Sequence, residues 1–315
     1  MRLAAACGTS APLTSHSMNH PDLARGIALS VLASALFAFL SGYTRLLAPL
    51  DGTTIFAWRI LWTLAAVLLL LAWQRRASSL PAALRTLLDS PAKLACLLLM
   101  AALLGLQQWL FLWAPVNGRA LEVSLGYFLL PLSMVLVGRF HYRERLAPLE
   151  KLAVACAMLG VAHELWLTRA FSWTTLVVAL GYPPYFILRR RVALDSLMLF
   201  AVELLLIAPV AVLLLYQADA FAQAASQPLL AAVLLPLLGV ASMVALASYL
   251  AAGQLLPMGL FGILGYVEPV LLVLVAMAVL GERLLPGQLG TYAPIWMAVV
   301  LTMLHSRRLM RRNVE

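Results

Sequence analysis

The sequence has little charge. Asp, Glu, Lys and Arg make up 11% of its 315 residues and hydrophobic residues make up 63%, whereas soluble proteins average ~25% and ~45–50%. This composition argues against a soluble domain and places the chain in a lipid bilayer. Acidic residues are especially scarce, with 13 against 22 basic residues and a net charge of +9. On so apolar a chain, the excess of basic over acidic residues predicts basic loops at an anionic cytoplasmic face and no nucleic-acid partner.

Motifs for catalysis and metal binding are also missing. The sequence contains no His-Glu-x-x-His, no Gly-x-Ser-x-Gly and no Gly-x-x-x-x-Gly-Lys, which argues against an intramembrane enzyme and against direct use of ATP. Its three cysteines, Cys7, Cys96 and Cys156, have neither metal-ligand nor redox spacing. We therefore predict no enzyme activity, no metal and no cofactor.

The amino-terminal 25 residues lack an uninterrupted apolar core of ~7–15 residues ahead of a small-residue cleavage site, so we expect no removable signal peptide. The mixed composition before Met18 suggests that translation starts at that methionine.

Long apolar runs, in contrast, are abundant. A helix needs about 20 apolar residues to cross a hydrocarbon core of ~30 Å, and ten stretches of the chain qualify. They are 26–47, 54–73, 92–114, 121–141, 148–167, 171–188, 196–215, 229–252, 258–280 and 289–306. The predicted fold is an all-α polytopic membrane protein of ten transmembrane helices. Only the connections around 74–91 and 216–228 are long enough for a small surface helix.

The distribution of basic residues predicts the orientation. An even number of spans puts both termini on one side. With the amino terminus inside, seventeen Lys and Arg fall in cytoplasmic segments, four fall outside and Arg59 falls within a span. Cytoplasmic loops of membrane proteins carry the excess of Lys and Arg, so we expect both termini in the cytoplasm.

Two distant segments of the chain resemble each other. Leu125–Pro148 and Leu264–Pro286 each contain Leu-Gly-Tyr, then Pro, then Glu-Arg-Leu-x-Pro. Glu144 lies thirteen positions after Pro131, and Glu282 lies thirteen positions after Pro269. The first copy falls on a cytoplasmic connection and the second on an outer one, which predicts two inverted five-helix repeats. Their limits are 26–167 and 168–306, flanked by a cytoplasmic tail at 1–25 and a basic tail at 307–315. Inverted repeats are typical of secondary transporters, whose substrate site lies near the midplane.

Several motifs resemble those of a known family. The stretches 58–62 (WRILW), 108–114 (QWLFLWA), 121–132 (LEVSLGYFLLPL) and 281–283 (GER) are similar to the RarD proteins, in the EamA branch of the drug/metabolite transporter superfamily. The resemblance covers nearly the whole chain from about Leu23 to Arg308. It implies a ten-helix permease of the bacterial inner membrane, in a family named for chloramphenicol sensitivity. The sequence departs from the family's pattern at Arg143, where a Gly usually precedes Glu144, and at Glu268, where some members have a small residue.

Charged residues inside apolar spans are the main site candidates, because inserting a charge costs ~2.5–3.5 kcal/mol even on a lenient scale. Glu268, about midway along its span and next to Pro269, is predicted to be a proton or cationic-group site, with a buried carboxyl as the alternative. Arg59 is read either as a substrate or counter-ion group or as a snorkelling anchor. Glu122 could line the pathway or simply favour a helix start. Glu203 could carry protons or hydrogen-bond between helices.

Tyrosines and prolines complete the candidate pathway. Tyr127 and Tyr266 belong to the two Leu-Gly-Tyr motifs, and Tyr185 follows the pair Pro183-Pro184. Because proline lacks an N–H and clashes with the preceding turn, helix breaks are predicted at Pro131, Pro183, Pro184 and Pro269. Glu144, which precedes a helix starting near Pro148, is read as structural.

Three classes of function fit a chain of this kind. The inverted repeat favours a secondary transporter of small organic solutes over the other two classes, a receptor or scaffold and an intramembrane enzyme. A receptor or scaffold has no reason to contain an inverted repeat. An aromatic, apolar wall with few charges suits an amino-acid-like metabolite. An amphipathic drug is the alternative substrate, suggested only by the family's name.

Overall fold

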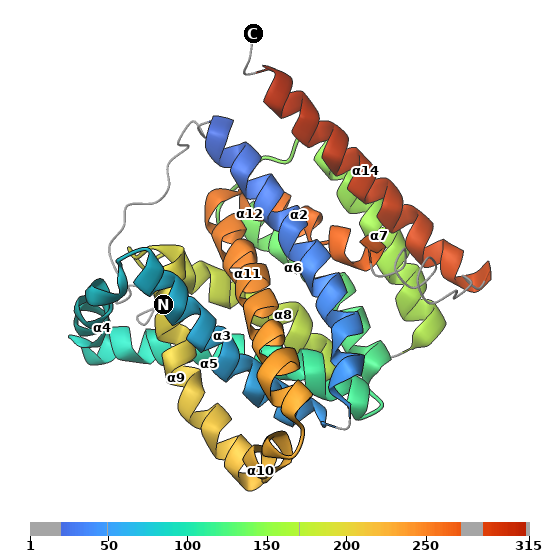
Figure 1. The fold of residues 1–315 in the computed structure, drawn as a ribbon. Helices are drawn as coiled ribbons and strands as arrows, with labels where there is room; N and C mark the ends of the chain where they lie inside the picture. Colours follow the sequence, from blue (N-terminus) through green and yellow to red (C-terminus); the bar gives the residue numbers. More distant parts are fainter. Residues whose placement is uncertain (1–19, 49, 170, 272–285, 313–315) are drawn as a thin grey trace. The chain divides into compact units, whose positions relative to one another are not determined.

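The computed structural model describes residues 20–48, 50–169, 171–271 and 286–312. Every regular element among them is helical (Figure 1). The elements in chain order are α2 (His20–Tyr43), η1 (Thr44–Leu47), α3 (Gly52–Trp73), η2 (Ala77–Ser79), α4 (Leu80–Leu88), α5 (Pro91–Val116), α6 (Ala120–Phe140), α7 (Pro148–Thr168), α8 (Trp173–Arg189), α9 (Ser196–Gln217), α10 (Ala220–Ala225), η3 (Leu230–Leu234), α11 (Leu235–Leu255), α12 (Met258–Leu264), η4 (Pro286–Gln288) and α14 (Leu289–Arg312).

Seven of the described helices are long and apolar enough to cross a membrane. They are Pro21–Leu47, Gly52–Trp73, Pro91–Ala114, Ala120–Phe140, Pro148–Thr168, Ser196–Gln217 and Leu230–Leu255. Two shorter apolar helices, Met258–Leu271 and Leu289–His305, fall in the last two predicted spans. The later part of the predicted span 258–280 lies outside the described residues. Glu282 and Arg283 also lie outside them. An all-helical, multi-pass protein is confirmed, and the count of ten stays a prediction.

Large apolar side chains are exposed on the outside of these helices. Phe140 is 77% exposed and Leu69 73% exposed, and extensive exposed apolar surface marks contact with a membrane or another protein. Trp73 and Trp166, exposed near the ends of α3 and α7, have the positions expected of aromatic residues at a membrane interface.

Carboxylates hold the first turns of several helices, because the first N–H groups of a helix have no partner within it. The Asp51 carboxylate accepts hydrogen bonds from the N–H groups of Thr53 and Thr54 at the start of α3. Asp195 does the same at α9 for Leu197 and Met198.

The two connections that are long enough for a small helix each contain one. These helices are α4 in the connection around 74–91 and α10 in the connection around 216–228.

Glu144 has a structural role different from the predicted one. Its two carboxylate oxygens accept hydrogen bonds from the N–H groups of Met258 (2.7 Å) and Gly259 (2.8 Å), at the first turn of α12. It therefore joins the segment after α6 to a helix more than a hundred residues away. The helix that begins at Pro148 is held by Glu150, which accepts a hydrogen bond from the Ala147 N–H at 2.7 Å.

The helices form two compact packing units. Among the described residues, unit 1 comprises 39–118 and 184–247, and unit 2 comprises 20–38, 119–183 and 248–312. In unit 1, α3 packs against α5 and α9. Gly52 lies so close to the Leu112 carbonyl that a larger side chain has no room there.

In unit 2, α14 lies along α7, and α12 packs on α6 (Figure 1). Its core contains Phe128, Ala157, Ile263, Tyr266 and Ile295. Tyr266 follows α12 directly and the other four side chains come from α6, α7, α12 and α14, so the core is continuous across these helices.

The units do not coincide with the predicted repeats. Unit 1 combines α3 and α5 from the first predicted repeat with α9 from the second, and unit 2 combines α6 and α7 with α12 and α14. Each unit thus takes helices at equivalent positions of both predicted repeats. The copies of the repeated motif meet inside unit 2, where the Tyr266 hydroxyl donates a hydrogen bond to the Phe128 carbonyl at 2.9 Å.

Candidate substrate pathway

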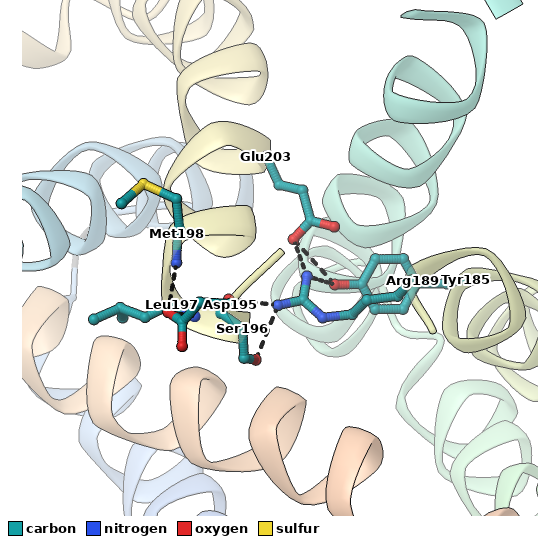
Figure 2. Close-up of polar contacts among 7 residues, drawn as sticks. All are labelled: Tyr185, Arg189, Asp195, Ser196, Leu197, Met198 and Glu203. Carbon is teal, nitrogen blue, oxygen red and sulfur yellow. Dashed lines mark hydrogen bonds and ion pairs between the residues drawn. The ribbon is translucent and has the colours of Figure 1, made fainter. Parts of the chain in front are cut away.

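Glu203 is fully buried on α9 and is paired with an arginine (Figure 2). Its Oε2 accepts hydrogen bonds from Arg189 Nη1 at 2.5 Å and from the Tyr185 hydroxyl at 3.1 Å. Arg189 Nη1 also donates to the Tyr185 oxygen at 3.0 Å. The structure therefore provides the partner that an interhelical hydrogen-bonding role of Glu203 requires. This partner is the cationic side chain of Arg189.

Arg189 also ties the end of α8 to the first turn of α9. Its Nη2 donates hydrogen bonds to the Ser196 carbonyl (2.7 Å) and hydroxyl (3.1 Å) (Figure 2). Removing two charges from water is costly and is repaid only by close geometry and further hydrogen bonds. The triad of Tyr185, Arg189 and Glu203 has both, although Glu203 Oε1 and Arg189 Nε find no hydrogen-bond partner among the described residues.

Sequence reasoning missed this role of Arg189. Arg189 is one of the seventeen basic residues assigned above to cytoplasmic segments, yet it is fully buried. One signal was present in the sequence. Tyr185 and Arg189 are four residues apart, so they share a helix face.

Arg59 is also an interior residue, only 2% exposed. Its Nε donates a hydrogen bond to the Ser242 hydroxyl at 2.9 Å. The guanidinium carbon lies 5.8 Å from the centre of the Phe111 ring, within the range of a cation–π interaction. These contacts favour an internal role over the snorkelling alternative.

Glu122 is the centre of a hydrogen-bonded cluster at the start of α6. Its Oε2 accepts from Arg119 at 3.1 Å, from the Thr174 hydroxyl at 2.6 Å and from the Ser172 hydroxyl. The Thr175 hydroxyl donates to the Glu122 backbone carbonyl at 2.7 Å. These bonds fasten α6 to α8, and the pathway role of Glu122 stays a prediction.

Glu268 follows an interruption in the helix that begins at Met258. Residues 265 and 266 form a turn, and helix resumes over 267–271. In this turn the Gly265 N–H donates to the carbonyls of Phe261 and Gly262, and the Tyr266 N–H donates to that of Ile263. Glu268 itself is half-buried, so its carboxylate is less enclosed than that of Glu203.

Tyr249 lies near Glu268 and among three other rings. The ring centres of Phe37, Tyr182 and Phe261 lie 5.8, 5.8 and 4.9 Å from that of Tyr249. Glu268 and Tyr182 are close enough to act electrostatically on Tyr249. A carboxylate and four aromatic rings, contributed by α2, α8, α11 and the segment from α12 onward, thus gather in unit 2.

The proline predictions need correction at three positions. α6 continues through Pro131, and α8 is one helix from Trp173 to Arg189 that includes Pro183 and Pro184. A proline at position 183 leaves the carbonyl of Ala179 without its helical donor, and the Ser133 hydroxyl donates to that carbonyl at 2.6 Å. A side chain of a neighbouring helix thus allows α8 to continue.

Pro269 lies beside an interruption, but the turn precedes it by three residues, at Gly265–Tyr266. Pro269 falls in the first turn of the resumed helix, where a missing N–H does no harm.

The tyrosines predicted to line the pathway differ in environment. Tyr185 and Tyr266 are buried, with their hydroxyls bonded as described, whereas Tyr127 is half-buried on α6. In the described part of the chain, no three His, Cys, Asp or Glu side chains are grouped as they would be to hold a metal ion.

Apolar helices with lipid-facing surfaces and charges held inside them define a multi-pass α-helical membrane protein. Residues 24–163 match the EamA-like transporter family. The chain is 53% identical to the chloramphenicol-sensitive protein RarD of Pseudomonas aeruginosa, over 92% of this chain and 97% of that protein. It is 28% identical to Protein RarD of Escherichia coli, over 94% and 99% of the two chains.

An uncharacterized transporter of Haemophilus influenzae is 37% identical over 88% of this chain and 93% of its own. A solved crystal structure covers 89% of this chain and 98% of its own with a TM-score of 0.64 at 17% identity, which shows a shared fold. The chain belongs to the EamA-like transporter family and, within it, to the RarD-type permeases of the drug/metabolite transporter superfamily.

Proposed function

We propose that this permease is a secondary transporter that exports small organic metabolites or drugs across the bacterial inner membrane. Ten spans, arranged as inverted repeats 26–167 and 168–306 with both termini in the cytoplasm, would open the site alternately to each side. The observation that carries the proposal is the turn at Gly265–Tyr266 followed by Glu268. Interrupted helices with ionisable groups near them are how transporters of this architecture build their midplane sites.

The packing units support alternating access. Each contains helices at equivalent positions of both predicted repeats, as expected when two inverted halves exchange roles. Charged side chains inside a membrane are rare because inserting them costs free energy. Three groups of residues contain such charges here: the Tyr185–Arg189–Glu203 triad, Arg59 with Ser242, and Glu268 with Tyr249.

The substrate class follows from these side chains. Aromatic rings and isolated charges suit an amino-acid-like metabolite or an amphipathic drug better than a multiply charged ion. A receptor or scaffold is the alternative function, and an intramembrane enzyme ranks below it, since the sequence contains none of the catalytic motifs sought.

Comparing metabolites in cells with and without the gene tests the proposal without requiring knowledge of the substrate. An exporter should lower the cytosolic level of its substrate and raise the level in the medium. The compound found in this way is then loaded into proteoliposomes containing the purified protein, with protein-free liposomes as the control. Protein-dependent efflux supports transport. Unchanged metabolites together with no efflux of any candidate would contradict it and favour the receptor or scaffold.

A further inference from the structure

We infer that His163, Thr291 and Glu164 of unit 2 form a proton-binding site, in which a threonine hydroxyl joins an imidazole to a carboxylate. The three residues are called the proton relay below. The inference names the ion to which transport responds, and it rests on the proposed transport function only for that response. His163 and Glu164 are neighbours on α7, and Thr291 lies in the first turn of α14.

The hydrogen bonds of the Thr291 hydroxyl are the first observation. Its oxygen lies 2.9 Å from His163 Nδ1, and the hydroxyl donates to Glu164 Oε2 at 2.8 Å. A hydroxyl has one proton to donate. Because Thr291 gives this proton to Glu164, it accepts one from His163, so the neutral imidazole carries its proton on Nδ1. Adjacent side chains of a helix do not face each other, and the hydroxyl is therefore the link between the two ionisable groups.

The second observation is the enclosure of the relay. Thr291 is fully buried, whereas His163 and Glu164 are half-buried. The Cβ of a larger residue at Gly290 would lie 2.5 Å from His163 Nε2, so the imidazole is seated directly on the α14 backbone. In the described part of the chain, neither His163 nor Glu164 has an ion pair with α6, α12 or α14, and Glu164 also acts electrostatically on Tyr292.

Uptake of a proton by the relay changes only N–H and O–H bonds. A proton from solution binds to His163 Nε2, the Nδ1 proton passes to the Thr291 oxygen, and the proton of that hydroxyl passes to Glu164 Oε2. The products are a neutral imidazole with its proton on Nε2 and a neutral carboxyl group that donates to Thr291. We expect this neutral pair over an imidazolium with a carboxylate, because charges held away from water are costly. The relay thus gains one proton while its hydrogen bonds reverse direction.

The third observation is the position of the relay, in the last two turns of α7 and the first turn of α14. The predicted orientation puts these helix ends at the outer face. Imidazole is the side chain that changes its charge between about pH 5 and pH 8. If an outer proton is taken up in exchange for the exported substrate, export should be faster into an acidic outer solution.

Nitrogen NMR of the purified full-length protein in detergent, with 15N-labelled histidine, tests the relay without transport. The 15N shift distinguishes a bare ring nitrogen from a protonated one, and His163→Gln identifies the signals of His163. We expect the proton on Nδ1 at about pH 8 and on Nε2 at about pH 5.5. Glu164→Gln accepts a hydrogen bond but cannot take up the proton, so acidification should leave both nitrogens of its His163 protonated.

Four further variants locate the relay. Thr291→Val keeps the shape without the hydroxyl and should abolish the switch from Nδ1 to Nε2, whereas Thr291→Ser should retain it. Gly290→Ala should abolish the switch by displacing the ring, although all three groups of the relay remain. Thr302→Val is the matched control, because Thr302 is a buried threonine of α14 whose hydroxyl donates to the Ala298 carbonyl of the same helix. It should switch like wild type.

The response of transport is measured in proteoliposomes with the compound found by metabolite comparison. The pH of the receiving solution is set to about 5.5 or about 8. Wild type, Thr291→Ser and Thr302→Val should export at least about threefold faster at the lower pH, whereas the rates of Thr291→Val should differ by less than about 1.5-fold.

A wild-type His163 with both nitrogens protonated after acidification would overturn the proton relay. An Nδ1 preference and switch that survive in Thr291→Val would do the same, and Gly290→Ala keeps the test valid if Thr291→Val fails to fold. Failure of transport is distinguishable. Protein-dependent efflux without the switch rejects the relay alone, while the switch without efflux of any candidate rejects the transport function and leaves the relay. A switch with efflux that ignores the outer pH rejects the link between them.

Discussion

Unit 1 and unit 2 both hold a glutamate within apolar helices, and the two carboxylates have different surroundings. Glu203 in unit 1 is fully buried and bonded to Arg189 and Tyr185. Glu268 in unit 2 is half-buried, follows a helix turn and acts electrostatically on Tyr249. We propose that the Glu203 charge stays in place and that the Glu268 charge meets a ligand. On this proposal, an intramembrane carboxylate is not by itself a sign of transport chemistry, because its partners determine its role.

The largest effect should come from breaking the pair in unit 1. Arg189→Met or Glu203→Met leaves one buried charge without its partner, which destabilises proteins by about 3–5 kcal/mol. Thermal melting in detergent should show a large loss for each single variant. The double variant should recover most of it, because apolar residues of similar volume replace buried pairs at little cost. A single variant as stable as wild type would show that the triad does not anchor α8 to α9.

A smaller effect is expected where α12 packs on α6, before the turn at Gly265–Tyr266. A side-chain methyl at Gly262 would meet the Pro131 carbonyl and the Met134 side chain. Gly262→Ala should therefore destabilise the protein by about 1–3 kcal/mol. Gly42→Ala is the control, since nothing lies within 4 Å of the position of a methyl there. Its melting temperature should be unchanged or slightly higher, because alanine is the better helix former. Equal melting of both variants would contradict the close packing beside the turn.

The smallest effect concerns Asp51, which lies outside the spans at the start of α3. Partial burial raises the pKa of its carboxyl, but hydrogen bonds from the Thr54 hydroxyl and from the N–H groups of Thr54 and Thr53 outweigh burial and lower the pKa below 3.8. A lowered pKa in the folded state gives stability that is complete above the unfolded-state value and lost as the pH falls through the folded-state value.

Asp51→Ala should accordingly cost about 1 kcal/mol at neutral pH, with a difference from wild type that shrinks below pH 4. Asp51→Asn keeps an acceptor oxygen and should retain most of the stability without that pH dependence. Melting curves between pH 3 and pH 7 measure both, and a pH-independent cost of Asp51→Ala would contradict the assignment.

Much of the helical architecture could be predicted from the sequence, because a bilayer requires long apolar helices with all backbone groups bonded internally. The described helices fall on the predicted spans, with α4 and α10 in the two connections long enough to hold them. Side-chain partners could not be predicted in this way. The burial of Arg189 depends on Glu203, fourteen residues away on the next helix. Glu144 holds a helix more than a hundred residues distant.

The proline errors have the same origin. A proline removes a helical hydrogen bond wherever it occurs, but whether the helix stops depends on the neighbours. At Pro183 the released carbonyl of Ala179 is bonded by Ser133 of α6, so α8 continues. At Pro269 the prediction was displaced, because the chain turns earlier, at Gly265–Tyr266. Tyr266 in that turn is held to α6 by its hydrogen bond to the Phe128 carbonyl.

Transport by the Glu268→Gln variant tests the central claim most directly. The substrate found by metabolite comparison is followed in proteoliposomes, first under an imposed pH gradient and then in exchange without one, with Glu268→Asp beside it. If Glu268 binds the substrate's ammonium group, Glu268→Gln should melt like wild type yet lose both activities, and Glu268→Asp should keep part of each. Loss of gradient-driven accumulation with exchange intact would instead assign Glu268 to proton coupling. Wild-type transport by Glu268→Gln in both conditions would contradict the claim that the carboxylate of unit 2 is the one that meets a ligand.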